Sequence, residues 1–152
     1  MEQHVEEKKK TVAKKKGGKK GTRPHVKAKK KTAVARAVAK SGTGRVHINK
    51  MNVSTISSPY VRSFIEEPMH LAGPVGKEVD IDVTVSGGGF MGQAVASRSA
   101  IAKALVQYAE DENLEKRMTA FDRLLLVDDP RRKEPKKPLG RGARKAKQLS
   151  FR

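Results

Sequence analysis

Hydrophobic and polar residues alternate most regularly between Val79 and Val85, where every second side chain is valine or isoleucine. This period of two predicts a strand with one face on a hydrophobic core. Four glycines follow, and glycine permits backbone conformations that other residues resist. The next apolar residues recur at helical spacing, with Ser99, Lys103 and Gln107 on the opposite side. The apolar face comprises Ala94, Ile101, Leu105 and Tyr108. We expect residues 79–108 to form a rigid unit of strand, glycine turn and helix.

A second alternating pattern precedes this unit. Between Thr32 and Lys40, four alanines alternate with larger side chains, which predicts a strand whose alanine face lets a helix lie close. The turn residues 41–44 separate it from another alternating run, Arg45 to Asn49. We predict that the two runs pair with each other as a hairpin.

Further helices are expected before and after the central unit. Ser58 and Pro59 are typical of a helix N-cap and first position, and the short apolar stripe after them ends before Pro68. Residues 69–76 contain Gly-Pro and are expected to form a loop. Apolar residues at helical spacing between Leu114 and Leu125 predict a final amphipathic helix. These elements favour an α+β fold, a small body of two layers.

The charge distribution divides the chain into three parts. The 152 residues carry a net charge of +18, and only 36% are hydrophobic, too few for a chain that packs throughout. Residues 1–31 contain 13 lysines and arginines against 3 glutamates, and residues 130–152 contain 10 against 1. Residues 32–129 contain 11 basic and 12 acidic side chains. We therefore predict a globular domain at 32–129 between two basic extensions.

Neither extension contains enough apolar residues to offset the entropy of ordering. We expect residues 1–31 to be disordered in isolation. They are either a solvated charged tail without a function of its own or an arm that binds a partner. Residues 130–152 reach up to about 75 Å when fully extended. They mix arginine with lysine, and arginine can pair with phosphate oxygens in a planar fork or stack on a base. Such basic arms favour polyanionic partners, which here means nucleic acid, an anionic membrane surface or an acidic protein.

The glycine turn allows several interpretations. Residues 87–92 match G-x-G-x-x-G, the dinucleotide fingerprint, but the preceding strand carries polar residues where a doubly wound parallel sheet is apolar on both faces. The outer frame of a P-loop also fits, but Gln93 and Ala94 stand where lysine and serine or threonine bind phosphate and magnesium. Two interpretations remain: exposed N–H groups that bind a phosphate at the helix N-terminus, and glycines chosen for tight packing.

The remaining composition gives no support for an enzyme. The chain has no cysteine, its four histidines show no metal-ligand spacing, and no serine lies in a recognisable nucleophile turn. We predict no cofactor, no metal and no small-molecule substrate. No apolar run is long enough for a membrane span or a secretory signal. Zinc-finger, basic-zipper and aromatic RNA-binding patterns are also missing, so backbone binding to structured RNA is the favoured chemistry.

Several segments resemble one known family when taken in order. They are residues 31–37, residues 44–49, the glycine turn continuing through Arg98 and Ile101 to Val106, and the tail from Asp128 to Arg152. Together they resemble the ninth protein of the small ribosomal subunit, over about residues 29–152, and the ending Ser-Phe-Arg is closer to archaeal and eukaryotic members. The resemblance implies a ribosomal body on the head of the small subunit and a C-terminal arm that runs through rRNA to the P-site tRNA.

The resemblance also implies site residues and partners. Ser150, Phe151 and Arg152 are expected to contact tRNA. The residues expected to bind rRNA are Arg36, Arg45, Gly87, Gly88, Gly89, Gly92, Arg98, Arg131, Arg132, Lys133, Lys136, Lys137, Arg141, Arg144, Lys145 and Lys147. The partners are small-subunit rRNA, P-site tRNA and neighbouring head proteins, in a cytoplasmic ribosome. The alternatives are a free basic RNA-binding factor and, less favoured, a nicotinamide-dependent enzyme.

Overall fold

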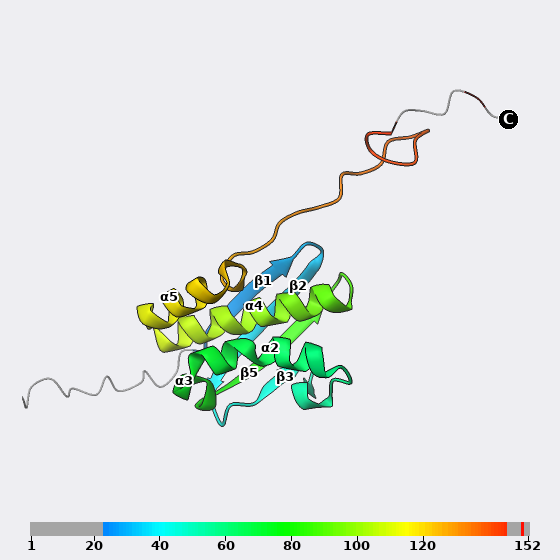
Figure 1. Ribbon diagram of the computed structural model, residues 1–152. Coiled ribbons are helices and arrows are strands. Elements are labelled where there is room, and N and C mark those ends of the chain that lie inside the picture. The colour runs from blue at the N-terminus through cyan, green and yellow to red at the C-terminus, as the bar shows by residue number, and fades with distance from the viewer. Residues whose placement is uncertain (1–22, 146–149, 151–152) are drawn as a thin grey trace, which may run out of the picture.

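A computed structural model describes residues 23–145 and residue 150 of the chain. It contains a sheet with helices packed on it and a C-terminal segment that extends away from the body (Figure 1). The strands are β1 (His25–Lys30), β2 (Ala33–Ser41), β3 (Val46–Ile48), β4 (Met51–Asn52) and β5 (Val79–Ser86). The helices are α2 (Pro59–Ala72), α3 (Pro74–Lys77), α4 (Phe90–Ala109) and α5 (Glu112–Phe121), with 3₁₀ turns η2 (Val53–Thr55) and η3 (Arg123–Leu125).

The sheet has five strands in the order β1-β2-β5-β3-β4. All neighbours are antiparallel except β3 and β5, which run parallel. Helices α2, α4 and α5 lie on one face of this sheet (Figure 1). The predicted α+β fold with two layers is confirmed. The sheet is not the parallel sheet of a dinucleotide-binding domain, which removes the structural basis for the enzyme alternative.

The predicted hairpin between residues 32–40 and 45–49 is wrong. β2 and β3 do not pair, because β5 lies between them and bonds to both. β2 instead forms its hairpin with β1, and β3 forms a small one with β4. The turn at residues 41–44 fitted a hairpin, but it connects two strands that flank a third. A turn sequence alone does not decide which strands pair, and here β5 pairs with β2 on one side and with β3 on the other.

The predicted disorder of residues 1–31 is also wrong at its C-terminal end. Residues 25–30 form β1, an edge strand that pairs with β2 from His25 opposite Val38 to Lys30 opposite Ala33. Ala28 in the middle of β1 is fully buried. Lysine-rich composition hid a period-two pattern in which Val26, Ala28 and Lys30 share one face. Residues 1–22 lie outside the described part of the chain.

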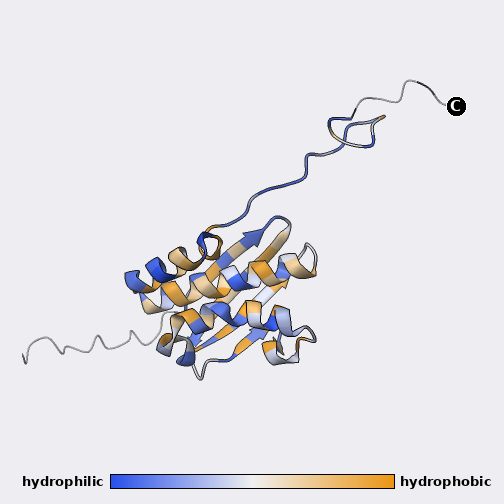
Figure 2. Cartoon of the chain, in the orientation of Figure 1, coloured by the Kyte–Doolittle hydropathy of each residue, from blue (hydrophilic) through white to orange (hydrophobic). Residues whose placement is uncertain are grey.

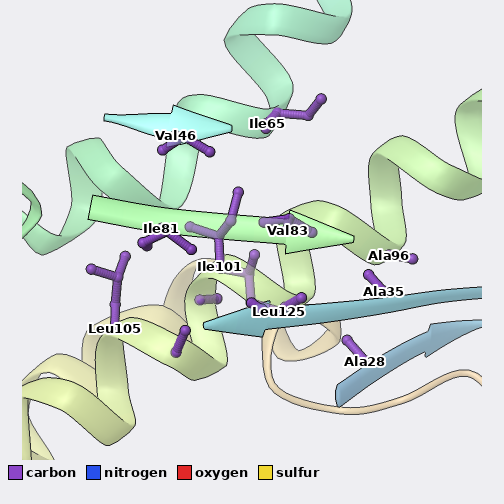
Figure 3. Close-up of a cluster of buried hydrophobic side chains, with 14 of the residues drawn as sticks. Ala28, Ala35, Val46, Ile65, Ile81, Val83, Ala96, Ile101, Leu105 and Leu125 are labelled. Carbon is purple, nitrogen blue, oxygen red and sulfur yellow. The ribbon is translucent and has the colours of Figure 1, made fainter. Parts of the chain in front are cut away.

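Small side chains set the distance between the sheet and α4. The four alanines of β2 are at most 1% exposed, and they face buried alanines of α4, including Ala96 and Ala100. Figure 3 shows Ala28, Ala35 and Ala96 at this contact, beside the larger Ile81, Val83, Ile101 and Leu105. The expectation that an alanine face lets a helix lie close is therefore confirmed. The alternation of β5 is confirmed as well, because Val79, Ile81, Val83 and Val85 are all buried.

Four predictions about the helices and the loop between them need correction. α2 begins at Pro59 as expected but continues through the buried Pro68 to Ala72, and α3 follows where a loop was expected. Pro68 cannot donate a backbone hydrogen bond inside the helix, and the packing of α2 against α4 compensates for this loss of stability. The final helix ends at Phe121 instead of Leu125, with η3 after it. Ser99, placed on the polar side of α4, is only 5% exposed, because α5, η3 and the tail root cover that side.

Candidate nucleic-acid interface

Arg36 lies on the face of the sheet that the helices leave uncovered. Along β2 the buried alanines alternate with side chains that point to this open face, and Arg36 is exposed there. Its neighbour on β5 is Thr84, and its neighbour on β1 is Lys27. The position of Arg36 is therefore compatible with the RNA contact predicted for it.

Arg45 is exposed at the end of a turn that Asp80 organises. The backbone N–H groups of Thr43 and Arg45 donate to Asp80 Oδ1 at 2.8 and 2.9 Å. These hydrogen bonds, from Arg45 first and Thr43 second, hold the pKa of Asp80 below its usual range. A Cβ on Gly42 would collide with the Asp80 carboxylate. The turn thus presents the Arg45 side chain to solvent beside the start of β3.

Arg98, predicted to bind rRNA, is enclosed in the protein. Its side chain is 7% exposed, and its Nη1 donates to Asp122 Oδ2 at 2.8 Å. Its Nη2 lies 2.7 Å from Glu67 Oε2 and forms an ion pair with it, but the angles do not allow a hydrogen bond. Its guanidinium lies 4.4 Å from the centre of the Phe64 ring. Arg98 therefore joins α2, α4 and η3, and this position corrects its assignment as an RNA contact.

Arg98 also affects the acidity of Asp122. Partial burial of Asp122 would raise the pKa of its carboxyl, but the hydrogen bonds from Arg98 and from the Leu124 N–H outweigh that effect and lower the pKa. The carboxylate thus stays ionised and holds both the arginine and the start of η3. No local pattern in the sequence predicts this cluster, because its members come from three separate segments.

Two glycines of the turn between β5 and α4 have a structural explanation. A Cβ on Gly87 would lie 2.7 Å from the Thr32 carbonyl oxygen, and one on Gly88 would lie 3.0 Å from Ala33 Cβ. Both residues also have positive φ, +75° and +67°. The turn therefore packs against the β1–β2 hairpin, as the tight-packing interpretation predicts.

The rest of the turn leaves room for a ligand. Gly89 has no atom within 4 Å of its would-be Cβ, and Gly92 has only an ordinary contact at 3.7 Å. Gln93, which stands where a P-loop has lysine, donates from its Nε2 to the Gly87 carbonyl at 3.2 Å and braces the turn. Gly89 thus keeps the phosphate interpretation open at the helix N-terminus.

Asp129 anchors the root of the C-terminal tail to the edge of the sheet. Its backbone forms a parallel bridge with Lys30, donating its N–H to the Lys29 carbonyl at 3.1 Å and accepting from the Lys31 N–H at 3.0 Å. Its side chain, 7% exposed, accepts hydrogen bonds from Lys30 Nζ at 2.8 Å and from Arg131 Nη2 at 2.7 Å. Arg131 above all, and then Lys30, hold the pKa of Asp129 far below its usual range.

Asp128 reinforces the same anchor. Its Oδ1 accepts from the Lys29 N–H at 3.2 Å and from Lys103 Nζ at 2.5 Å. Residues 128 and 129 therefore satisfy backbone groups that an edge strand would otherwise leave unpaired. Asp128 and Asp129 together fix where the tail leaves the body.

Comparison with known proteins identifies the relatives of this chain. A family model described as ribosomal protein S9/S16 matches residues 28–152. The chain belongs to this family. It is 52% identical over 116 residues to "Small ribosomal subunit protein uS9" of Thermoplasma acidophilum, covering 76% of this chain and 90% of that protein. It is 47% identical over 116 residues to the protein of the same name from Picrophilus torridus, covering 76% and 87%. The resemblance to archaeal members is confirmed.

The tail of this S9/S16 family member is basic and open to solvent. Every arginine and lysine from 131 to 145 is exposed; they are Arg131, Arg132, Lys133, Lys136, Lys137, Arg141, Arg144 and Lys145. Arg131 is partly engaged by Asp129, and Arg144 Nε lies 2.9 Å from Glu134 Oε2. Figure 2 shows this segment as predominantly hydrophilic. Ser150 is exposed, whereas Lys147, Phe151 and Arg152 lie outside the described residues.

Other kinds of site find no support in the described part of this ribosomal protein. Residues 23–145 and 150 contain no cluster of three or more potential metal ligands. Within the same residues, no helix has the length and apolar character to cross a membrane. The basic residues that sequence analysis missed are Lys27 and Lys29 of β1, which face the open side of the sheet. Their alternation with Val26 and Ala28 is the signal that could have identified them as strand residues.

Proposed function

We propose that this protein is a structural constituent of the small ribosomal subunit, that it binds rRNA through its body and C-terminal tail, and that Ser150, Phe151 and Arg152 contact P-site tRNA. The observation that carries the proposal is the family match, which includes the tail up to residue 152. The names of both relatives place those proteins in the small subunit. No catalytic role is proposed, because the family consists of ribosomal proteins.

The shape of the chain supports a positioning role. A compact body offers one basic turn at Arg45 and one open sheet face, and a tail anchored by Asp129 extends away from it (Figure 1). Fixing the tail root makes the direction of the tail dependent on the body, so that binding of the body to rRNA also places the tail. The exposed lysines and arginines of the tail would neutralise crowded phosphates. The expected partners remain rRNA, P-site tRNA and neighbouring head proteins in cytoplasmic ribosomes.

Sedimentation at high salt tests membership of the ribosome. The tagged protein from its own cells should migrate with small subunits in stoichiometric amounts and resist the wash. Release to the top of the gradient would favour a free basic RNA-binding factor instead.

The tRNA contact needs a separate test. Deleting Ser150 to Arg152 should leave subunit assembly intact and weaken retention of P-site tRNA. Lys136→Gln is the matched control, because it removes one positive charge from the middle of the tail, as the deletion removes that of Arg152, and it should weaken rRNA binding without a selective effect on tRNA. A deletion that blocks assembly would contradict the proposed role of the tip.

Binding of the isolated protein to a transcript of the rRNA head should also depend on salt. If about five tail residues contact phosphates, the affinity should fall roughly a few hundredfold between 50 and 200 mM salt. An affinity that does not change with salt would rule out this mode of binding.

A further inference from the structure

One whole face of the sheet has no described element over it. The helices all pack on the opposite face (Figures 1 and 2). The burial patterns of β1, β2 and β5 place alternate residues of these strands on the open side. The open face, defined here by these outward residues of β1, β2, β3 and β5, includes His25, Lys27, Lys29, Val34, Arg36, Val38, Lys40, His47, Asp80, Asp82, Thr84 and Ser86. The side chains of the open face therefore lie outside the hydrophobic core.

The acids of the open face are already engaged at one end of it. Asp80 accepts the backbone N–H groups of Thr43 and Arg45. Asp82 forms an ion pair with Lys40, and His47 Nδ1 lies 3.3 Å from Asp82 Oδ1. Neither carboxylate is left to pair with cations elsewhere on the face. The acidic and basic charges of this end largely cancel.

The other end carries positive charge without acids. Lys27 lies directly opposite Arg36 in the β1–β2 register, and Lys29 is two residues further along β1. Residues directly opposite in an antiparallel pair have Cβ atoms about 4.5–5.5 Å apart, and like charges there destabilise the sheet. The neighbour of Arg36 on its other side is Thr84, which is uncharged. Among the described residues, no acid forms an ion pair with Lys27, Lys29 or Arg36.

We propose that the Lys27–Arg36 pair, with Lys29 beside it, binds the phosphate backbone of rRNA. This inference rests on the proposed ribosomal function and assigns a binding surface to the body. A polyanion removes the repulsion between the two cations, which explains why the sheet carries them opposite each other. The hydroxyls of Thr84 and Ser86 lie on the same face and can also donate to phosphate oxygens.

The composition of the open face favours phosphate contacts over base readout. Proteins that read unpaired bases stack them on aromatic side chains. Among the described strand residues of this face, no phenylalanine, tyrosine or tryptophan is present. The face should therefore bind structured RNA through its backbone and its shape.

The test compares two double variants of the full-length protein that remove the same charge. Lys27→Thr/Arg36→Thr keeps residues that favour strands and removes the opposed cations. Lys116→Gln/Arg117→Gln removes two exposed cations from α5, on the helix-covered side. Binding to a transcript of the rRNA head is measured over a range of salt, together with thermal unfolding of the free protein.

For the sheet variant, we expect the slope of log affinity against log salt to become shallower by about 1.8, with roughly a 50-fold loss of affinity at 0.1 M salt. Its melting temperature should be unchanged or higher, because the repulsion is gone. The α5 variant should lose less than about threefold in affinity, since its charges act only from a distance. Exchanging the two cations, in Lys27→Arg/Arg36→Lys, should restore most of the binding.

Three results would overturn the inference: unchanged RNA binding by the sheet variant, equal losses in both variants, or unfolding of the sheet variant, which would make the opposed cations stabilising. The proposed function is judged separately. If the wild-type protein neither binds the transcript nor sediments with small subunits, that function fails. If the wild type does both and the sheet variant behaves like the wild type, the open-face assignment alone fails.

Discussion

Replacing Arg98 with methionine should lower the free energy of unfolding by about 3 kcal/mol. Methionine keeps much of the apolar stem against the Phe64 ring but removes the charge that Glu67 and Asp122 share. Removing one partner of a buried ion pair costs about 3–5 kcal/mol, because the remaining charge is left without compensation. Glu67 and Asp122 are 34% and 30% exposed, so water can partly solvate them, and the lower end of this range applies.

Urea unfolding of the full chain measures this effect, and thermal unfolding should show a midpoint roughly 10 °C lower. The control is Arg117→Met on α5, where an exposed arginine is lost and the change should stay within about 0.5 kcal/mol. At a temperature where both variants are folded, the affinity of Arg98→Met for rRNA should match that of the wild type. A variant with normal stability and weakened RNA binding would refute the structural role of Arg98.

A second substitution isolates the ion pair from the loss of packing. Glu67→Gln should destabilise the wild-type background, where it removes a partner of Arg98. In the Arg98→Met background it should be neutral or stabilising, since it then removes an uncompensated carboxylate. Additive effects in the two backgrounds would show that the two residues do not interact as the geometry requires.

The glycine turn and the tail root give further predictions. Gly88→Ala should cost about 1–3 kcal/mol in unfolding free energy, because φ is +67° and the Cβ would press on Ala33, whereas Gly89→Ala should stay within about 0.5 kcal/mol. Equal losses in the two would contradict the assigned packing. Asp129→Asn should lower stability at neutral pH, because the folded-state pKa of Asp129 is depressed and its ionised form stabilises the fold above the unfolded pKa. Acid titration of unfolding measures this: the gap between variant and wild type should close as pH falls below about 4, and a gap that stays constant would contradict the role of its charge.

The local parts of the fold were predictable from short sequence patterns. β5, the glycine turn and α4 follow one another in the chain, and each is identified by its own periodicity or by the conformational freedom of glycine. The alanine face of β2 is likewise a local pattern with a direct packing consequence. The basic tail needed only composition, because exposed charged residues without apolar neighbours have no core to join.

Long-range relations were not predictable in the same way. The insertion of β5 between β2 and β3 depends on which strands bury their faces together, and a turn sequence such as residues 41–44 fits either arrangement. The β1 strand was obscured by lysines that composition alone assigns to a disordered arm, and it gains its stability from pairing with β2. Both the strand order and the formation of β1 depend on tertiary contacts, because strand pairing joins residues far apart in the chain.

The sequence by itself determined that the chain has a small α+β body, a basic C-terminal tail and a family resemblance that points to RNA. Only the tertiary structure decided what each charge does. Arg36 and Arg98 look alike in sequence, but Arg36 is exposed opposite Lys27, whereas Arg98 is buried with Asp122, 24 residues away. The physical reason is that the role of a charged side chain depends on its solvation and on its nearest partners in space, and both are products of folding.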